Sequence, residues 1–212
     1  MLRKLYLSPL GYLISFVLNC LAVFHKPFMV YGFSNRIDRK FYKLTRIASN
    51  VKLINKEKID IKNNVWIGYN CLLDGIGGIK IEEGVNIASH SCVYTHSSQN
   101  SIRILGNKFI EIPAENRPGY IIDNVIIGAY TFIGTSCVIL SGTRIGKGCV
   151  VGAGSVLSGE FPDYSIVVGN PAKIVGDTRK TDASLYKSGM NFENYFDKET
   201  VDEIKNNSAN NS

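Results

Sequence analysis

A period of six residues constrains this chain more than any other feature. Between residues 121 and 161 an aliphatic side chain returns at every sixth position. The series is Ile121, Ile127, Ile133, Ile139, Ile145, Val151 and Leu157. Neither the 3.6-residue period of an α-helix nor the two-residue period of a strand produces this spacing. A repeat of six is typical of a parallel β-helix, in which each hexad forms one short strand and one corner.

A second, mostly small residue follows each aliphatic residue by four positions. This series is Val125, Thr131, Cys137, Thr143, Cys149, Ser155 and Phe161. Glycine directly follows the aliphatic residue at positions 128, 134, 146 and 152, where a corner needs backbone freedom. We expect both series to point into the coil and to stack on their equivalents in the coils above and below.

The same pattern occupies an earlier block and is then interrupted. The block contains Ile61, Ile67, Leu73, Ile81, Ile87 and Val93, with a change of register at residues 75–78. The repeat stops at Ser97 and restarts at Ile121, so residues 97–120 form a long insertion. Insertions of this length are uncommon and often functional. We expect this one to protrude and to cover a cleft or reach a neighbouring subunit.

The N-terminal segment combines an apolar stretch with basic flanks. Residues 5–24 carry no charge, and residues 1–60 hold 11 Lys and Arg against 3 Asp and Glu. The stretch is long enough for a transmembrane helix, but its polar residues, proline and glycine lower its hydrophobicity. We therefore expect association with an anionic membrane surface first, a membrane span second and packing on the body third. Residues 26–50 are predicted to be a linker with some helical character.

The remaining features bound the protein class. The five cysteines include no CxxC pair, and reduced, buried thiols indicate a cytoplasmic enzyme. No zinc-finger or RNP-like motif supports binding to nucleic acid. Residues 178–205 are predicted to hold one or two short helices, followed by a disordered tail at 206–212. The predicted organisation is an N-terminal helical segment at 1–50, a β-helix at 51–176 and a C-terminal extension at 177–212.

Three segments together resemble the left-handed β-helix acyltransferases. They are VIIGAYTFIGT at 125–135, GAGS at 152–155 and VGNPAKI at 168–174. This family includes galactoside, maltose and xenobiotic acetyltransferases and the O-acetyltransferases of capsule and lipopolysaccharide synthesis. The resemblance implies an all-β, left-handed parallel β-helix of hexapeptide repeats, with three hexads per coil. It also implies acetyl-CoA as acyl donor, no metal, and a homotrimer with active sites between subunits.

Acyl transfer to a hydroxyl needs a base, an oxyanion donor and a slot for the CoA arm. The chain has three histidines, His25, His90 and His96. His96 lies in a Tyr-Thr-His segment where the repeat stops, which resembles the segment carrying the base in sugar O-acetyltransferases. We expect His96 to be the general base. His90, at a coil corner, is the alternative, and His25 is not expected to act as a base.

The resemblance also suggests cofactor contacts. Relatives carry a W-I-G-S segment and, eighteen residues after its serine, the alanine of G-A-G-S; Thr135 and Ala153 match these two positions. Their spacing equals one coil of three hexads, so we expect them to stack as an edge for the pantetheine arm. The cofactor residues expected are Gly134, Thr135, Ala153, Gly154, Ser158 and Lys173. Lys173 is the expected phosphate contact, with Arg179 and Lys180 as possible supplements.

For the acceptor, Asp74, Asn70 and Tyr94 are candidates for binding sugar hydroxyls, although each also suits a turn or surface position. The leading prediction is acetyl transfer to a sugar hydroxyl in capsule, lipopolysaccharide or exopolysaccharide synthesis. The main alternative is N-acylation of a nucleotide-linked amino sugar. A small-molecule acceptor, a zinc-dependent hydration enzyme of the γ-carbonic anhydrase type and a non-catalytic scaffold are further alternatives.

Overall fold

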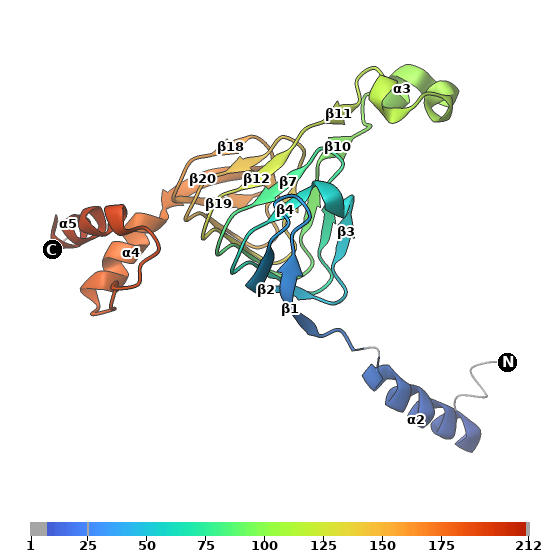
Figure 1. Cartoon of the computed structure of the whole chain (residues 1–212), viewed down its shortest axis with the longest axis horizontal. Coiled ribbons are helices and arrows are strands. Elements are labelled where there is room, and N and C mark those ends of the chain that lie inside the picture. The colour runs from blue at the N-terminus through green and yellow to red at the C-terminus, as the bar shows by residue number, and fades with distance from the viewer. Residues whose placement is uncertain (1–7, 25, 211–212) are drawn as a thin grey trace.

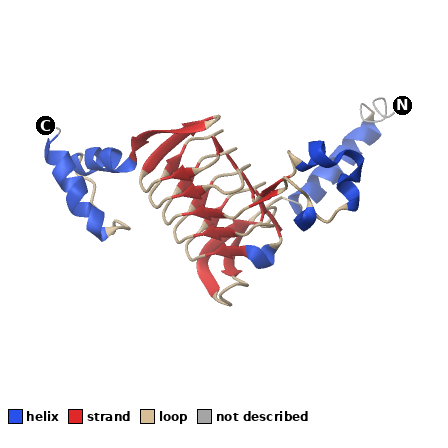
Figure 2. Ribbon diagram, turned by 90° about the horizontal axis from the view of Figure 1, so that it is seen from above, coloured by secondary structure: helices blue, strands red, loops and turns tan. Residues whose placement is uncertain are grey.

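The computed structural model describes residues 8–24 and 26–210. Its centre is a column of stacked coils bounded by three sheets, which we name A, B and C (Figures 1 and 2). Sheet A contains β1 (Met29–Ser34), β2 (Phe41–Ala48), β5 (Trp66–Ile67), β8 (Asn86–Ile87), β13 (Phe132–Ile133), β16 (Val150–Val151), β19 (Ser165–Gly169) and β20 (Ala172–Asp177). Sheet B contains β3 (Lys52–Ile54), β6 (Leu72–Asp74), β9 (Cys92–Tyr94), β14 (Val138–Ile139) and β17 (Val156–Leu157). Sheet C contains β4 (Ile59–Ile61), β7 (Ile79–Ile81), β12 (Val125–Ile127), β15 (Arg144–Ile145) and β18 (Glu160–Phe161).

The chain visits sheets A, B and C in turn, and each strand pairs in parallel with its equivalent in the next coil. The fold is therefore a parallel β-helix, as the six-residue period predicts. Phe132 is in register with Val150, one coil of eighteen residues later. In the first block Trp66 is in register with Asn86, because the B–C corner of that coil is two residues longer.

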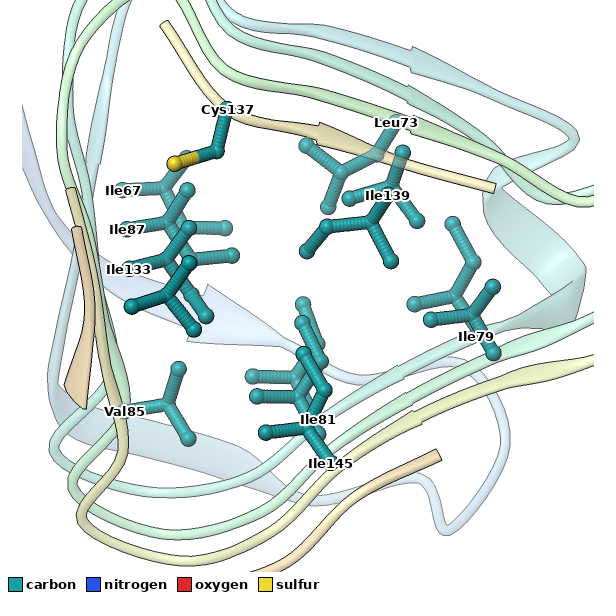
Figure 3. Close-up of a cluster of buried hydrophobic side chains, with 14 of the residues drawn as sticks. Ile67, Leu73, Ile79, Ile81, Val85, Ile87, Ile133, Cys137, Ile139 and Ile145 are labelled. Atoms are coloured by element: carbon teal, nitrogen blue, oxygen red, sulfur yellow. The ribbon is translucent and has the colours of Figure 1, made fainter. Parts of the chain in front are cut away.

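The hexad series forms the core of the column. In Figure 3, Ile67, Ile87 and Ile133 lie in one stack, and Leu73 lies near Ile139. All five side chains are fully buried, which contributes about 1.5–3 kcal/mol for each large aliphatic residue. The small positions also point inward. Cys137 and Cys149 are buried, and burial raises the pKa of both thiols, so they remain protonated packing residues.

Two positions depart from the predicted register. Ile121 is 37% exposed and belongs to β11 (Ile121–Ile122), outside the column. The column resumes only at β12. At the other end, Phe161 does not occupy a small position but is in register with Ile145. The last B–C corner is two residues shorter than the hexad count requires, because β18 begins at Glu160 directly after Ser158 and Gly159.

The insertion protrudes from the B–C corner of the third coil (Figure 1). Its stem is an antiparallel pair of short strands, β10 (His96–Ser97) and β11, with His96 opposite Ile122. Its tip contains α3 (Ser101–Leu105) and the 3₁₀ helices η2 (Gly106–Glu111) and η3 (Ala114–Asn116). A further 3₁₀ turn, η1 (Lys56–Lys58), lies at the same corner of the first coil.

The N-terminal segment differs from its prediction. Helix α2 (Pro9–Phe24) is followed by an antiparallel hairpin of β1 and β2, and β2 pairs in parallel with β5. The prediction of a linker at 26–50 is therefore wrong, because β2 completes sheet A at the N-terminal end of the column. Among the described helices, none is both long and apolar enough to cross a bilayer. Residues 1–7 and His25 lie outside the described residues.

The C-terminal extension contains α4 (Thr178–Lys187), η4 (Lys198–Thr200) and α5 (Val201–Asn210). Phe196 anchors it by packing on Tyr130 and Tyr164 of the column. Asp197 accepts hydrogen bonds from Lys147 Nζ and from the Tyr164 hydroxyl. The Lys147 ammonium group holds the pKa of the Asp197 carboxyl well below its usual range. Helix α5 runs to Asn210, so most of the tail predicted to be disordered is helical.

Candidate active site

His96 lies at the B–C corner, where the chain leaves the column for the insertion. Its side chain is 24% exposed, and its Nδ1 atom lies 3.6 Å from Oδ2 of Asp74. Nδ1 is buried and has no hydrogen-bond partner among the described residues. The imidazole thus presents one nitrogen to a carboxylate, slightly beyond hydrogen-bond distance, a separation that often shortens when substrate binds.

The neighbouring coil fixes the position of Asp74. Asp74 ends β6 and is in register with Tyr94 at the end of β9. The hydroxyl of Thr95 donates to the Asp74 carbonyl at 2.7 Å and accepts from the Gly77 amide at 2.7 Å. The Ile76 amide donates to Oδ1 of Asp74 at 3.3 Å. These bonds hold Oδ1 within the corner and leave Oδ2 facing His96.

The geometry gives Asp74 a different position from the one expected. It was predicted to contact the acceptor, yet its side chain is only 10% exposed and lies against His96. A carboxylate at this place favours a proton on Nδ1, which leaves Nε2 with a free lone pair. Tyr94 is half-buried beside it, and burial raises the pKa of its phenol, so the hydroxyl stays protonated.

The insertion adds two residues that the sequence interpretation did not single out. The Tyr120 ring stacks on His96 with 5.9 Å between centroids. The Arg117 guanidinium lies 5.7 Å from the centre of the Tyr120 ring and 3.9 Å from that of Phe109. Its Nε donates to the Ile112 carbonyl at 2.7 Å. Tyr120 could have been identified from its position in the sequence, because it lies at the end of the insertion, just before the column resumes.

His90 and Asn70 lie at a different corner, between sheets A and B. Both are exposed and have left-handed backbone conformations, with φ of 65° and 58°. The side chain of Asn70 accepts from the Asn50 amide group at 2.6 Å. These contacts mark them as corner residues, and the structure does not bring Asn70 together with Asp74 and Tyr94. Since His90 and His96 occupy different corners, they do not converge as ligands of one zinc ion. Among the described residues, no group of three or more potential ligands could hold a metal ion.

Thr135 and Ala153 also lie at the A–B corner, one coil apart. The strands before them are in register, Ile133 with Val151, so the two residues occupy equivalent positions. Gly134 packs so closely that a Cβ there would lie 2.6 Å from the Ala153 amide nitrogen. The amides of Thr135 and Ala153 donate to no acceptor among the described residues. The Thr135 hydroxyl donates to the Ser89 carbonyl at 2.7 Å.

The remaining cofactor candidates are spread over the C-terminal coils. Gly154 is exposed at the A–B corner beside Ala153, whereas Ser158 is exposed at the B–C corner. Lys173 is exposed on β20, in register with Val168 of β19. Arg179 already pairs with Asp177 and Glu203, so its guanidinium is less suited to supplement Lys173.

The candidate site is thus divided between two corners of one chain. The B–C corner carries His96 and Asp74, and the A–B corner carries the edge of Thr135 and Ala153. Sheet B separates the two corners. One chain alone therefore does not bring the imidazole next to this edge.

Comparisons with known proteins identify the hexapeptide repeat and the fold of the column. Residues 124–159 match the family model described as bacterial transferase hexapeptide (six repeats). A probable acetyltransferase of Mycobacterium tuberculosis is 48% identical over 115 residues, which are 53% of this chain and 35% of that protein. The chain thus spans about a third of the length of this curated relative.

Solved structures share the fold. A point mutant of AntD, an N-acyltransferase from Bacillus cereus, in complex with dTDP-4-amino-4,6-dideoxyglucose and coenzyme A, is similar with a TM-score of 0.52. It is 26% identical, and the match covers 69% of this chain and 89% of that one. A maltose O-acetyltransferase from Clostridium difficile 630 is also 26% identical, with a TM-score of 0.50 and coverage of 61% and 64%. The chain thus carries the hexapeptide repeat of bacterial transferases at residues 124–159, and its parallel coils and six-residue repeat are similar to those of acetyltransferases.

Proposed function

We propose that this protein transfers an acetyl group from acetyl-CoA to a sugar hydroxyl, with His96 as general base and Asp74 as its positioning residue. The observation that carries this proposal is the imidazole–carboxylate pair at the base of the insertion, 3.6 Å apart. The free cysteines in the column and the use of a CoA thioester as acyl donor both favour a cytoplasmic location of the enzyme. Surface-polysaccharide synthesis, of capsule, lipopolysaccharide or exopolysaccharide, is the proposed context.

The reaction needs only one proton carrier. As the acceptor oxygen attacks the thioester carbonyl carbon, Nε2 of His96 takes the hydroxyl proton. Asp74 stabilises the imidazolium that forms. The tetrahedral intermediate then collapses, the C–S bond breaks, and the imidazolium returns the proton to the leaving thiolate. The products are a sugar ester and free CoA thiol. Tyr120, stacked on His96, restricts the rotation of the imidazole and forms one wall beside the acceptor.

We infer that the edge of Thr135 and Ala153 holds the pantetheine arm. Pantetheine contains two amide groups, and the two unpaired backbone amides are suitable donors for their carbonyl oxygens. Gly134 allows the coils to approach closely there, and Gly154 keeps the corner open. Lys173 supplies a cation for the CoA phosphates, and Ser158 would contact CoA only from the B–C corner. Binding of coenzyme A by the structurally similar AntD supports this assignment.

We also propose that two copies of the chain form each active site, within a homotrimer. The separation of His96 from the Thr135–Ala153 edge in one chain supports this, because a neighbouring copy can place its own edge beside His96. Mixing subunits tests it. His96→Ala lacks the base, and Ala153→Trp blocks the edge with a side chain at an exposed position.

Refolded one-to-one mixtures of these two inactive variants should regain about a quarter of wild-type activity, because random assembly joins an intact base to an intact edge at that frequency. Each variant refolded alone is the control. If the mixture stays as inactive as its components, while native mass spectrometry shows mixed trimers, the site lies within one chain.

N-acylation of a nucleotide-linked amino sugar is the second candidate. The similarity to AntD, whose structure contains an amino sugar nucleotide, favours it. An amine needs less help from a base than a hydroxyl does, so the His96–Asp74 pair favours the hydroxyl. Acceptors offering hydroxyls or an amine should be tested with acetyl-CoA, followed by mild alkali. An ester releases its acetyl group and supports the first proposal, whereas an alkali-stable amide supports the second.

A further inference from the structure

The N-terminal end of the molecule carries apolar side chains that are largely exposed. Helix α2 projects away from the column (Figure 1), and Tyr12 and Phe16 are 74% and 67% exposed. Leu10, Leu13 and Val17 are exposed as well. The helix contains no charged residue. A surface helix of a soluble domain normally buries its apolar face against the core, and α2 does not.

The hairpin of β1 and β2 extends this apolar surface. Phe28, Tyr31, Phe41 and Leu44 are all more than half exposed. The basic side chains between Phe28 and Leu44 in the sequence are exposed as well. These are Arg36, Arg39, Lys40 and Lys43. None of the four forms an ion pair with a described residue. Aromatic rings mixed with lysine and arginine are typical of protein surfaces at the membrane–water interface.

We propose that α2 and the hairpin β1–β2 form a docking surface for an anionic lipid bilayer. A 16-residue helix is about 24 Å long and shorter than the ~30 Å hydrocarbon core, so it lies in the interface rather than crossing it. Its apolar side chains enter the acyl region, the hairpin aromatics lie at headgroup level and the unpaired cations face anionic headgroups.

Charge distinguishes a bilayer from a second copy of the chain as the partner of this surface. Residues 8–48, which contain α2 and the hairpin, hold six basic residues and one acidic residue, so two such surfaces repel each other, whereas anionic headgroups attract both. Docking does not depend on the proposed acyl transfer, since binding is measured without turnover. If both proposals hold, docking keeps the enzyme at the surface where membrane-anchored acceptors lie.

Co-sedimentation of the full chain with vesicles tests the proposal. One set of vesicles contains equimolar phosphatidylethanolamine and phosphatidylglycerol, and the other contains only phosphatidylcholine. The variants are Leu13→Glu with Phe16→Glu in α2, and Lys40→Gln with Lys43→Gln in the hairpin. Met190→Glu is the matched control, because Met190 is 53% exposed but lies between α4 and α5 in the C-terminal extension.

We expect binding to the anionic vesicles and at least tenfold weaker binding to phosphatidylcholine. The α2 variant should lose binding, and each removed lysine should weaken it about fivefold at low salt. Met190→Glu should bind like wild type. In a Phe16→Trp variant, tryptophan emission should shift to shorter wavelength on addition of anionic vesicles, which shows insertion of α2 independently of the acidic variants.

Three outcomes would overturn the proposal. The first is no binding of the wild type to anionic vesicles. The second is a loss of binding in Met190→Glu that is as large as the loss in the α2 variant. The third is a larger oligomer of the wild type in light scattering that the α2 variant reduces, since α2 would then contact another copy of the chain.

Discussion

The pair of Asp74 and His96 permits a quantitative prediction for Asp74→Asn. Asparagine keeps the oxygen that accepts the Ile76 amide, so the corner should retain its shape while the charge beside His96 disappears. Two unit charges about 4 Å apart interact by about 1 kcal/mol in water and about 4 kcal/mol at an effective dielectric constant of ~20. The side chains of His96 and Asp74 are 24% and 10% exposed, so an intermediate value of about 2–3 kcal/mol applies.

This interaction stabilises the imidazolium formed as the acceptor hydroxyl loses its proton. Its loss should lower kcat by about 30- to 150-fold, since each ~1.4 kcal/mol corresponds to a factor of ten. The KM for acetyl-CoA should not change. The assay is release of free thiol from acetyl-CoA at saturating acceptor, with circular dichroism to check folding. Glu82→Gln is the control, because it removes a carboxylate directly after β7, where Glu82 pairs with Lys80. Asp74→Asn activity within threefold of the wild type would refute the positioning role.

Two further predictions concern the edge and the hairpin. Gly134→Ala places a Cβ 2.6 Å from the Ala153 amide nitrogen. Thermal unfolding should show that the free energy of unfolding falls by about 1–3 kcal/mol, and enzyme kinetics should show a higher KM for acetyl-CoA. Gly154→Ala is strained by the φ of 73° at this position, but its Cβ meets no atom within 4 Å; it should therefore raise that KM less, and an equal rise would contradict the close-packing argument. The Tyr42 hydroxyl lowers the pKa of Asp38 to about 2, so Asp38 contributes stability that is present above pH ~4 and is lost as pH falls toward 2. Tyr42→Phe should move that pKa back toward its ordinary value in an NMR titration, and an unchanged value would contradict the assignment.

The column could be predicted because its rules are local and repeat. Each hexad specifies one buried aliphatic position, so Ile133 and Ile139 could be assigned to the core without knowledge of their neighbours. The prediction failed at both ends of the repeat, where the count of six no longer matches the corners. Ile121 fits the count but pairs with Ser97 in the stem of the insertion, and Phe161 follows a shortened corner.

Long-range pairing explains the other differences. Strand β2 forms because β5 follows it one coil later, and nothing in residues 41–48 alone indicates such a partner. Asp74 faces His96 because Asp74 ends β6 and His96 follows two residues after Tyr94, its partner at the end of β9, which depends on the twenty-residue length of that coil. Stacking of Tyr120 on His96 likewise depends on the antiparallel stem that brings the two ends of the insertion together.

The most direct test of the proposed function is thiol release from acetyl-CoA by wild type and His96→Ala over a panel of sugar acceptors, together with CoA binding by calorimetry. We predict that the wild type acetylates at least one sugar, and that His96→Ala loses at least a hundredfold in kcat, in line with general-base catalysis, while binding CoA normally. Equal turnover by both proteins would show that His96 is not the base. Absence of CoA binding by the folded wild type would contradict acyl transfer from CoA altogether.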